Sequence, residues 1–563
     1  MFALEEVSEV SPLTPDELKA EECFSKSHFR LPDGRFSVAL PFKTSPCCLG
    51  ESRKIALRPL LQTESRHAKS PHLRAPYVEF MKDYLDSNHM ELAPPLKSGQ
   101  IVYYIPHHAV HRPDDPPEKI RVVFNASQKS SSGISLNELL LPGPRLQLDI
   151  WKVVTRFRVG KWVFTADIRQ MFRQIQHPPE DRELLRILWR FDTSQPVQEY
   201  RLCTVTYGTT SAPYLACRVL QELALTSQAS FPLASEILRD RTYVDDISGG
   251  GPTLEVALQS RDQLIQLLSQ AQIELRKWAS NQPQLLNKIP SEYLLPAMSS
   301  VCLENDEESQ LKILGLCWKP AQDYFHFLIR SDPNVQTKRQ LASQIAKVFD
   351  PLGWLIPVTV FARAIFRIVC QPSFDWDDPL PSSIVQEWAQ FAVSLPALSK
   401  IHIPRFLSLP NPKCYLVGFA DASERAYAAV VYLVSQSEDT VISLVMSKAR
   451  MAPMKPVTLP RLELCAAHLL ALTINKIRLL FPQITTQNIL AFSDSTIALA
   501  WITATPPPHW KVFVGNRVAT ILEKVPASQW FHIPSSQNPA DCASRGVRPQ
   551  ELVSHQLWWE GPP

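Results

Sequence analysis

Two adjacent aspartates, Asp245 and Asp246, lie in a stretch whose composition is typical of a tight hairpin. Tyr243 and Val244 precede them, and the glycine-rich segment Gly249–Gly251 follows shortly after. Because adjacent carboxylates repel each other, they need a cation nearby in order to ionise together. Hard divalent ions such as Mg²⁺ prefer oxygen ligands of this kind. The pair therefore predicts a metal-binding turn between two strands.

A third acid strengthens this interpretation. An Asp-Asp pair alone is weak evidence, and two other such pairs in the chain adjoin prolines and indicate solvated turns. Upstream, however, the apolar stretch that begins at Lys161 reads as a strand and ends in Asp167. An aromatic residue, Phe172, follows a few positions later. A strand ending in an acid and a hairpin carrying two more acids predict one shared site.

The motifs around these acids resemble those of reverse transcriptases in their order. Phe164–Asp167 looks like the first palm motif, and Tyr207–Pro213 and Tyr243–Asp246 look like the next two. The wider sequence resembles the BEL/Pao group of long-terminal-repeat retrotransposons, from about Gly34 to Pro562. The segments that carry this wider resemblance are Lys119–Ser127, Ser135–Asn137, Leu275–Trp278 and Val348–Gly353.

The resemblance implies an α+β fold, in which a right-hand polymerase with fingers, palm and thumb/connection is followed by a ribonuclease H-like α/β domain. The boundaries expected from it are residues 1–95 for an N-terminal leader or linker region, 96–300 for fingers and palm, 301–410 for thumb/connection, 411–547 for the ribonuclease H-like domain and 548–563 for a C-terminal linker.

By resemblance, Asp167, Asp245 and Asp246 hold two Mg²⁺ or Mn²⁺ ions, which can clamp the attacking and leaving oxygens of a phosphoryl transfer. The remaining roles concern the incoming nucleotide. Lys119 and Arg121 grip its triphosphate, unless they only form a solvated strand face. Phe172 blocks a ribose 2′-hydroxyl, unless it is an ordinary core residue, and Gly208 allows close backbone approach. Lys277 protonates the leaving pyrophosphate, with Arg276 or Lys288 as alternatives.

A second set of acids occupies the C-terminal part. Asp421 and Asp494 each end an apolar strand, Glu463 lies in the first turn of a helix that Pro460 opens, and Asp541 lies at a helix start. This order of four acids resembles ribonuclease H, which implies two-metal hydrolysis with Mg²⁺ or Mn²⁺ as the ions. His532 would assist proton movement or product release, oriented by Asn538, unless it is simply a packed or exposed histidine.

Composition limits the other classes. The chain has 563 residues, 45% of them apolar, enough for several cores, and a net charge of +3, so any basic track for nucleic acid must be local. Eleven scattered cysteines without a Cys-x-x-Cys indicate reduced thiols in an intracellular protein. We expect no membrane association, because the start is acidic and the longest apolar stretch is interrupted by proline. No aspartic protease motif is found.

The sequence thus predicts an RNA-directed DNA polymerase, a nucleotidyltransferase, with ribonuclease H activity that replicates a BEL/Pao-like retrotransposon. Its partners would be an RNA template, a DNA primer, the RNA–DNA hybrid and dNTPs, with a homo-oligomer left open. The upstream protease and the downstream integrase of the polyprotein are expected outside this chain. A cytoplasmic particle is the expected location, with the nucleus as an alternative. The rival hypothesis is a catalytically inactive, nucleic-acid-binding remnant.

Overall fold

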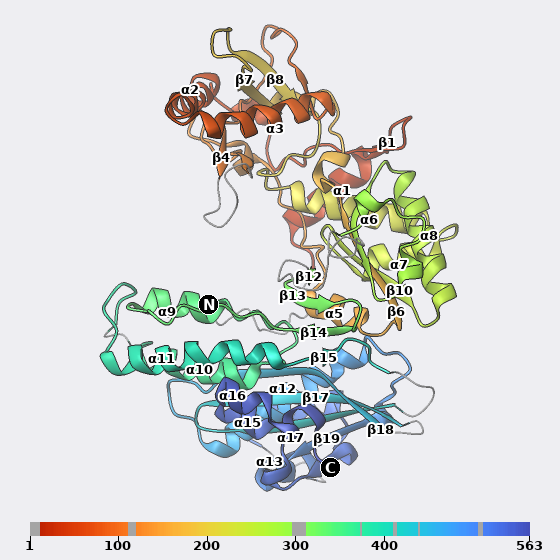
Figure 1. The fold of residues 1–563 in the computed structure, drawn as a ribbon, viewed down its shortest axis with the longest axis vertical. Helices are drawn as coiled ribbons and strands as arrows, with labels where there is room; N and C mark the ends of the chain where they lie inside the picture. Colours follow the sequence, from red (N-terminus) through yellow and green to blue (C-terminus); the bar gives the residue numbers. More distant parts are fainter. Residues whose placement is uncertain are drawn as a thin grey trace.

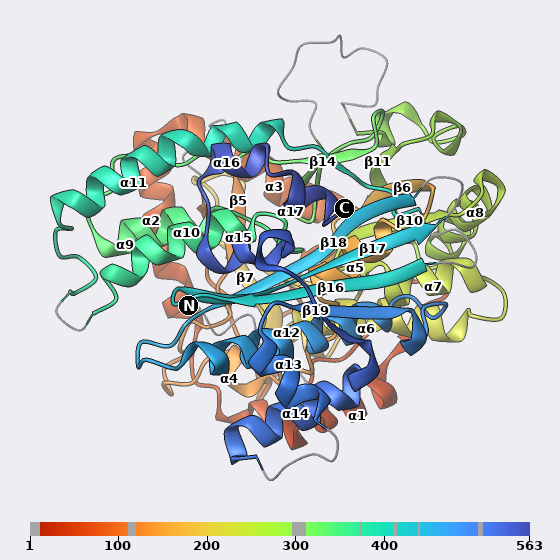
Figure 2. The same cartoon turned by 90° about the horizontal axis from the view of Figure 1, so that it is seen from below.

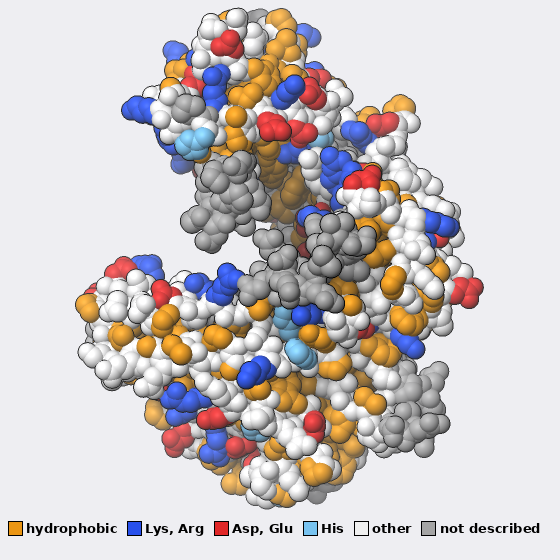
Figure 3. All heavy atoms as spheres, in the orientation of Figure 1, with side chains coloured by type: hydrophobic (Ala, Val, Ile, Leu, Met, Phe, Trp, Pro, Cys, Tyr) orange, Lys and Arg blue, Asp and Glu red, His pale blue; other side chains and the backbone are white. Residues whose placement is uncertain are grey.

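The computed structural model describes residues 12–110, 120–295, 311–371, 374–408, 414–436, 440–504 and 510–563. Lys119 therefore lies outside the described residues. The molecule is C-shaped, with an upper lobe, a middle part and a lower lobe (Figure 1). The space-filling view shows a wide hollow between the upper and lower lobes (Figure 3). None of the described helices combines the length and the apolar character needed to cross a membrane.

The upper lobe is a small α+β unit with its own apolar core. Its two sheets have the strand orders β3-β8-β7 and β4-β5, and all their pairings are antiparallel. Buried aromatic side chains, among them Tyr77 and Trp189, fill the space between these sheets and the helices. Its elements are α2 (Arg53–Lys69), α3 (Arg74–Asp86), β3 (Met90–Leu92), β4 (His107–Val110), β5 (Arg121–Phe124), α4 (Leu136–Leu139), β7 (Arg186–Trp189) and β8 (Gln198–Leu202).

The middle part is a four-stranded antiparallel sheet of order β11-β6-β10-β9, here called the central sheet. Side chains alternate along β6, so Phe164, Ala166 and Ile168 are buried in one core, while Asp167 points to the other face. The strands are β6 (Trp162–Ile168), β9 (Thr242–Tyr243), β10 (Asp246–Gly251) and β11 (Leu275–Ser280), and the main helices are α5 (Ile150–Phe157), α6 (Ala212–Thr226), α7 (Pro232–Asp240) and α8 (Leu254–Ser269).

The N-terminal segment is an integral part of the fold. Helix α1 (Pro15–Ser27) begins at a Thr14 capping box and buries Ala20 and Phe24 in the core of the central sheet. Strands β1 (Phe29–Arg30) and β2 (Phe36–Ser37) form a short hairpin after it. The region expected to be a leader or linker therefore supplies core side chains from Ala20 onward.

A second small sheet connects the central sheet to the lower lobe. Its strands are β12 (Leu311–Ile313), β13 (Leu316–Lys319), β14 (Tyr324–His326) and β15 (Ile403–Pro404). Strands β12 and β13 form a hairpin, with Leu314 and Gly315 in its turn. Helices α9 (Lys338–Ala346), α10 (Ile356–Ile368) and α11 (Ser382–Ser394) follow in the chain and lie over the lower lobe (Figure 1).

The Val348–Gly353 motif forms the turn that begins α10. Asp350 accepts hydrogen bonds from the backbone N–H groups of Trp354 at 2.9 Å and Leu355 at 2.6 Å. Gly353 has φ +77°, and a Cβ there would lie 2.0 Å from the carbonyl oxygen of Ser447. Only glycine allows this close approach, which docks the turn against the strand that carries Ser447.

The lower lobe is built on a five-stranded sheet of order β18-β17-β16-β19-β20, here called the C-terminal sheet. Strands β16, β17 and β18 are antiparallel, whereas β16, β19 and β20 are parallel. Helix α12 covers one face, and α10 and α15 lie on the other (Figure 2). The elements are β16 (Cys414–Ala422), β17 (Ala426–Gln436), β18 (Thr440–Met451), α12 (Leu459–Arg478), β19 (Ile489–Ser493), α13 (Thr496–Thr503), α14 (Val512–Lys524), β20 (Trp530–His532) and α15 (Ala540–Arg545).

The C-terminal segment, which the sequence suggested to be a linker, is folded onto this lobe. It forms α16 (Pro549–Val553) and α17 (Gln556–Glu560), and Trp558 is completely buried. The indole N–H of Trp558 donates to the carbonyl of Trp354 at 3.0 Å, and its own carbonyl accepts from the Tyr432 hydroxyl at 2.7 Å. The last described residues therefore close the core of the lower lobe.

Candidate active sites

The three acids expected in the central sheet meet at one end of it. Asp167 on β6 and Asp246 on β10 are direct cross-strand partners, and Asp245 occupies the two-residue turn between β9 and β10. The backbone N–H of Ile168 donates to the carbonyl of Asp245 at 2.9 Å, which fixes the turn to β6. Val244 has φ +56°, a conformation that is strained for a β-branched residue and persists where its surroundings enforce it.

The electrostatics of this cluster are those of carboxylates without enough counter-charge. Burial, followed by the charges of Asp245 and Asp167, raises the pKa of Asp246 to about 6. Burial also raises the pKa of Asp245, with Asp167 adding to the effect. Each shift favours the neutral form, so the site gains from a bound cation.

Lys277 supplies one positive charge to this site. Its Nζ lies 3.0 Å from Asp167 Oδ2, although the side chain is 61% exposed. Lys277 has φ +52° within a β-bulge between Arg276 and Ala279, and such a bulge re-aims a side chain. The candidates for protonating the pyrophosphate are Lys277, Arg276 and Lys288, and of these Lys277 is the one that pairs with Asp167.

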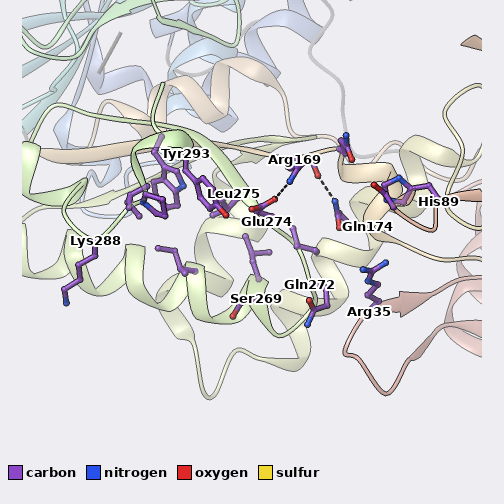
Figure 4. Close-up of a pocket in the computed structure, with 18 residues that line it drawn as sticks. Arg35, His89, Arg169, Gln174, Ser269, Gln272, Glu274, Leu275, Lys288 and Tyr293 are labelled. Atoms are coloured by element: carbon purple, nitrogen blue, oxygen red, sulfur yellow. Dashed lines mark hydrogen bonds and ion pairs between the residues drawn. The ribbon is translucent and has the colours of Figure 1, made fainter. Parts of the chain in front are cut away.

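Arg276 is used differently. It pairs with Glu274 at 2.7 Å, and its guanidinium lies 3.3 Å from the centre of the Tyr293 ring. Arg169 Nη1 donates to the other oxygen of Glu274 at 2.8 Å. These side chains and Lys288 lie at the outer edge of β11, where a cavity of about 560 Å³ is lined by Arg35, His89, Arg169, Glu274 and Lys288 among others (Figure 4). The three acids do not line this cavity.

The Tyr207–Pro213 motif is held in place by Asn137. The Asn137 side chain donates to the Gly208 carbonyl at 2.9 Å and accepts from the Thr210 N–H at 2.8 Å. Gly208 has φ +104°, and a Cβ there would lie 2.0 Å from the Phe124 carbonyl oxygen. Gly208 is therefore required for a close approach to the chain's own strand β5, and its approach to template and nucleotide stays a prediction. The Tyr207 ring packs on Phe124, with centroids 5.4 Å apart.

The remaining candidates for nucleotide binding are placed as follows. Arg121 is exposed at the start of β5. Phe172 lies in a short 3-10 helix after β6, half-buried against the core of the central sheet. This position is compatible with both roles considered for Phe172, and its role as a sugar-selecting residue stays a prediction.

In the lower lobe, three of the four expected acids converge. Asp421 near the end of β16, Glu463 on α12 and Asp494 directly after β19 each offer an oxygen, and these oxygens lie within 4.8 Å of one another. The adjacent strands β16 and β19 are parallel, so their carboxyl ends bring Asp421 and Asp494 together. Helix α12 begins at Leu459, which places Glu463 just beyond the first turn in which the sequence suggested it.

This triad fits a hard divalent cation. Burial, followed by the charges of its neighbours, raises the pKa of Glu463 to about 9, and burial raises the pKa of Asp421 to about 7. Glu463 Oε2 is buried and has no hydrogen-bond partner in the described part of the chain. An unpartnered buried oxygen is costly unless a ligand satisfies it. Carboxylate oxygens are the donors that Mg²⁺ and Mn²⁺ prefer.

Asp541 stands slightly apart from this triad. Its Oδ1 accepts from Arg545 Nε at 2.6 Å, an ion pair within α15. The Ser544 hydroxyl, one residue earlier, donates to Asp421 Oδ2. No sequence pattern singles out Ser544 and Arg545, and their nearness to Asp541 in the chain is the one signal that points to them.

Asn538, which the sequence predicts to orient His532, contacts Asp494. It is 1% exposed, and its Nδ2 donates to the Ala420 carbonyl at 3.0 Å and lies 3.4 Å from Asp494 Oδ1. Ser535, also missed, donates to Asp494 Oδ2 at 2.6 Å. His532 is exposed at the end of β20, paired with Ser493 beside the strand end that leads to Asp494.

The comparisons with known proteins agree with this geometry. Residues 337–495 match the family described as the Pao retrotransposon-like RNaseH-like domain. No curated protein matches the chain. Two solved structures of a foamy viral protease-reverse transcriptase with double-stranded DNA share the fold at 15% identity. The first has a TM-score of 0.54 and covers 80% of this chain and 68% of that one; the second has a TM-score of 0.52 and covers 81% and 82%.

The expected α+β fold is therefore confirmed, and the expected resemblance to Pao retrotransposons is confirmed for residues 337–495. The region that matches the Pao family begins directly before α9 and includes Asp421, Glu463 and Asp494. The solved structures extend the likeness to most of the chain. The chain has the fold of the foamy viral protease-reverse transcriptase structures over most of its length, and its residues 337–495 are similar to the Pao retrotransposon-like RNaseH-like domain.

Proposed function

We propose that the chain is an RNA-directed DNA polymerase with ribonuclease H activity, which acts in the replication of a BEL/Pao-like retrotransposon. The observation that carries the proposal is the pairing of Asp167 with Asp246 across β6 and β10, with Asp245 in the turn beside them. The separate triad in the lower lobe supports a second reaction at a second site.

In the central sheet, Asp167, Asp245 and Asp246 hold the Mg²⁺ or Mn²⁺ ions, and Lys277 and Arg121 contact the phosphates of a dNTP. In the lower lobe, Asp421, Glu463 and Asp494 hold the ions, with Asp541 at the margin. When bound, divalent ions lower the pKa of an attacking hydroxyl or water and neutralise charge on the phosphates. Asn538 and Ser544 orient Asp494 and Asp421 through the hydrogen bonds described above. His532 is placed to move a proton or assist product release.

The substrates follow from this pair of reactions. Polymerisation on an RNA template from a DNA primer leaves an RNA–DNA hybrid, and the lower-lobe site removes its RNA strand. Proteins grip such a duplex through its backbone shape and the 2′-hydroxyl groups rather than through sequence. The hollow between the lobes is wide and open on one side, which suits a duplex rather than a small ligand (Figure 3).

The test is primer extension on an RNA template, run beside cleavage of a preformed hybrid. Asp245→Asn should abolish extension and keep cleavage, because Asp245 lies in the central sheet, whereas Asp494→Asn should do the reverse. Loss of both activities in one folded variant would contradict two separate sites. A folded wild type that binds hybrid but performs neither reaction would support the rival, an inactive nucleic-acid-binding remnant.

A further inference from the structure

Two buried arginines join the central sheet to the C-terminal sheet. Arg158, at the end of α5, is 1% exposed, and Arg405, directly after β15, is fully buried. Arginine is rarely buried to this extent unless every donor is satisfied.

Arg405 holds the start of the strand that carries Asp167. Its guanidinium forms a two-point ion pair with Asp323, at 2.6 and 2.8 Å. The same guanidinium donates to the carbonyl oxygens of Phe157 at 2.6 Å, Gly160 at 2.7 Å and Lys161 at 3.0 Å. Lys161 immediately precedes β6, so Arg405 fixes the start of the strand that carries Asp167 near its end.

Arg158, which lies beside Arg405, contacts the lower lobe. Its Nη1 donates to the carbonyl of Leu444 on β18 at 2.9 Å. Its Nε and Nη2 donate to the carbonyls of Arg405 at 3.1 Å and Pro404 at 3.2 Å. The backbone closes the loop, because the N–H of Leu407 donates to the Arg158 carbonyl at 2.7 Å.

The contact at Leu444 leads laterally to the nuclease acids. Leu444 pairs with Tyr432 on β17, and Tyr432 pairs with Val417 on β16, the strand that carries Asp421. The apolar core is continuous across the same junction, since one cluster includes Val153 and Phe157 of α5 together with side chains of the C-terminal sheet. Domains move relative to each other by default unless their interface is large and apolar, and this interface is apolar with a polar clamp.

We propose that Arg158 and Arg405 are positioning residues that hold the two active sites at one fixed separation. The proposal rests on the proposed function, because it concerns a hybrid that passes from the first site to the second. With the separation fixed in a single chain, the nuclease cuts the RNA within a narrow range of distances from the primer end. Without these two arginines the lower lobe shifts relative to the central sheet, and the range of distances between the RNA cuts and the primer end broadens.

The experiment maps RNA cleavage relative to a primer blocked at its 3′ end, using a labelled RNA template. Arg158→Met should lower the share of cuts at the dominant position at least about threefold, with primer extension on its own and cleavage of blunt hybrid little changed. Arg156→Met is the matched control, because Arg156 lies on α5, which leads to Arg158, and pairs with Asp240 inside the middle part of the molecule. Its cleavage pattern should equal that of wild type.

A second variant and a second measurement keep the test decisive. Asp323→Asn preserves the shape and removes the charge that anchors Arg405, so it should broaden the pattern even if Arg158→Met fails to fold. Calorimetry needs no activity: wild type should unfold both lobes in one transition, and the variants should split it in two. Unchanged patterns and an unsplit transition in both folded variants would overturn the clamp. A wild type without activity would overturn the proposed function, while a split transition would still support the clamp.

Discussion

The ammonium of Lys277 lies 3.0 Å from Asp167 Oδ2, at the same sheet end where Asp167 faces Asp246. The contact depends on the positive φ of Lys277 and on the bulge that carries it. Lys277 therefore partly balances the acids without a divalent ion. The proposed contact of Lys277 with the phosphates of a nucleotide would require this long and exposed side chain to leave Asp167.

Lys277→Met should lower the rate of primer extension by roughly 100-fold, the usual contribution of a general acid. Arg276→Met is the matched control, because Arg276 is engaged with Glu274 and Tyr293 and should affect extension much less. Single-turnover extension at saturating dNTP measures both variants. Equal losses in the two would remove the assignment of Lys277, and cleavage of preformed hybrid should be unchanged in each.

The pKa shifts in the lower lobe predict how stability depends on pH when divalent ions are removed. The pKa of Asp421 is raised to about 7 and that of Glu463 to about 9, in each case first by burial. A raised folded pKa means that the folded state retains protons that the unfolded state loses. The stability that these two groups contribute is therefore fully present below the ordinary carboxyl range and is lost as the pH rises through about 7 and then 9.

The melting temperature of the wild type in EDTA should thus fall between pH 6 and pH 9, and Mg²⁺ should reverse the shift most strongly at pH 9. Glu463→Gln should flatten the dependence, because an amide does not ionise, and should weaken the response to Mg²⁺. Thermal melts with and without the ion measure both effects. A melting temperature that rises with pH in EDTA would contradict the assignment of these acids as a cation site.

Which features could be predicted depended on whether the sequence itself carries them. Asp167 and Asp494 were found because an apolar strand followed by an acid is a local pattern that survives folding. Arg158 and Arg405 were not, because their partners are mainly backbone carbonyls of distant segments, which leave no side-chain pattern. The contact between Lys277 and Asp167 needs a bulge and a positive φ at Lys277, and a lysine in the sequence predicts neither. The burial of Trp558 was not predicted, because residues 548–563 are short and have the composition of a linker.

Phe172→Val should admit ribonucleotides, because a smaller side chain leaves room for a 2′-hydroxyl. The ratio of kcat/KM for dNTP over rNTP should fall by about 10-fold or more, which corresponds to roughly 1.4 kcal/mol of lost discrimination. Met171→Leu is the control, since Met171 is a buried neighbour in the same short helix and the change conserves volume. An unchanged ratio together with a lower melting temperature would assign Phe172 to the core.

Asn538→Ala and His532→Ala should have different signatures in hybrid cleavage. Asn538 holds both Ala420 and Asp494 from a buried position, so its loss should raise the Mg²⁺ concentration for half-maximal cleavage by about 10-fold or more, as loss of a residue that orients a ligand does. His532 is exposed at the end of β20, so its loss should lower kcat and leave the Mg²⁺ midpoint unchanged. Cleavage rates over a Mg²⁺ titration separate the two effects. A shifted midpoint in His532→Ala would place His532 near the ions, and an unshifted one in Asn538→Ala would mean that Ser535 alone is enough to orient Asp494.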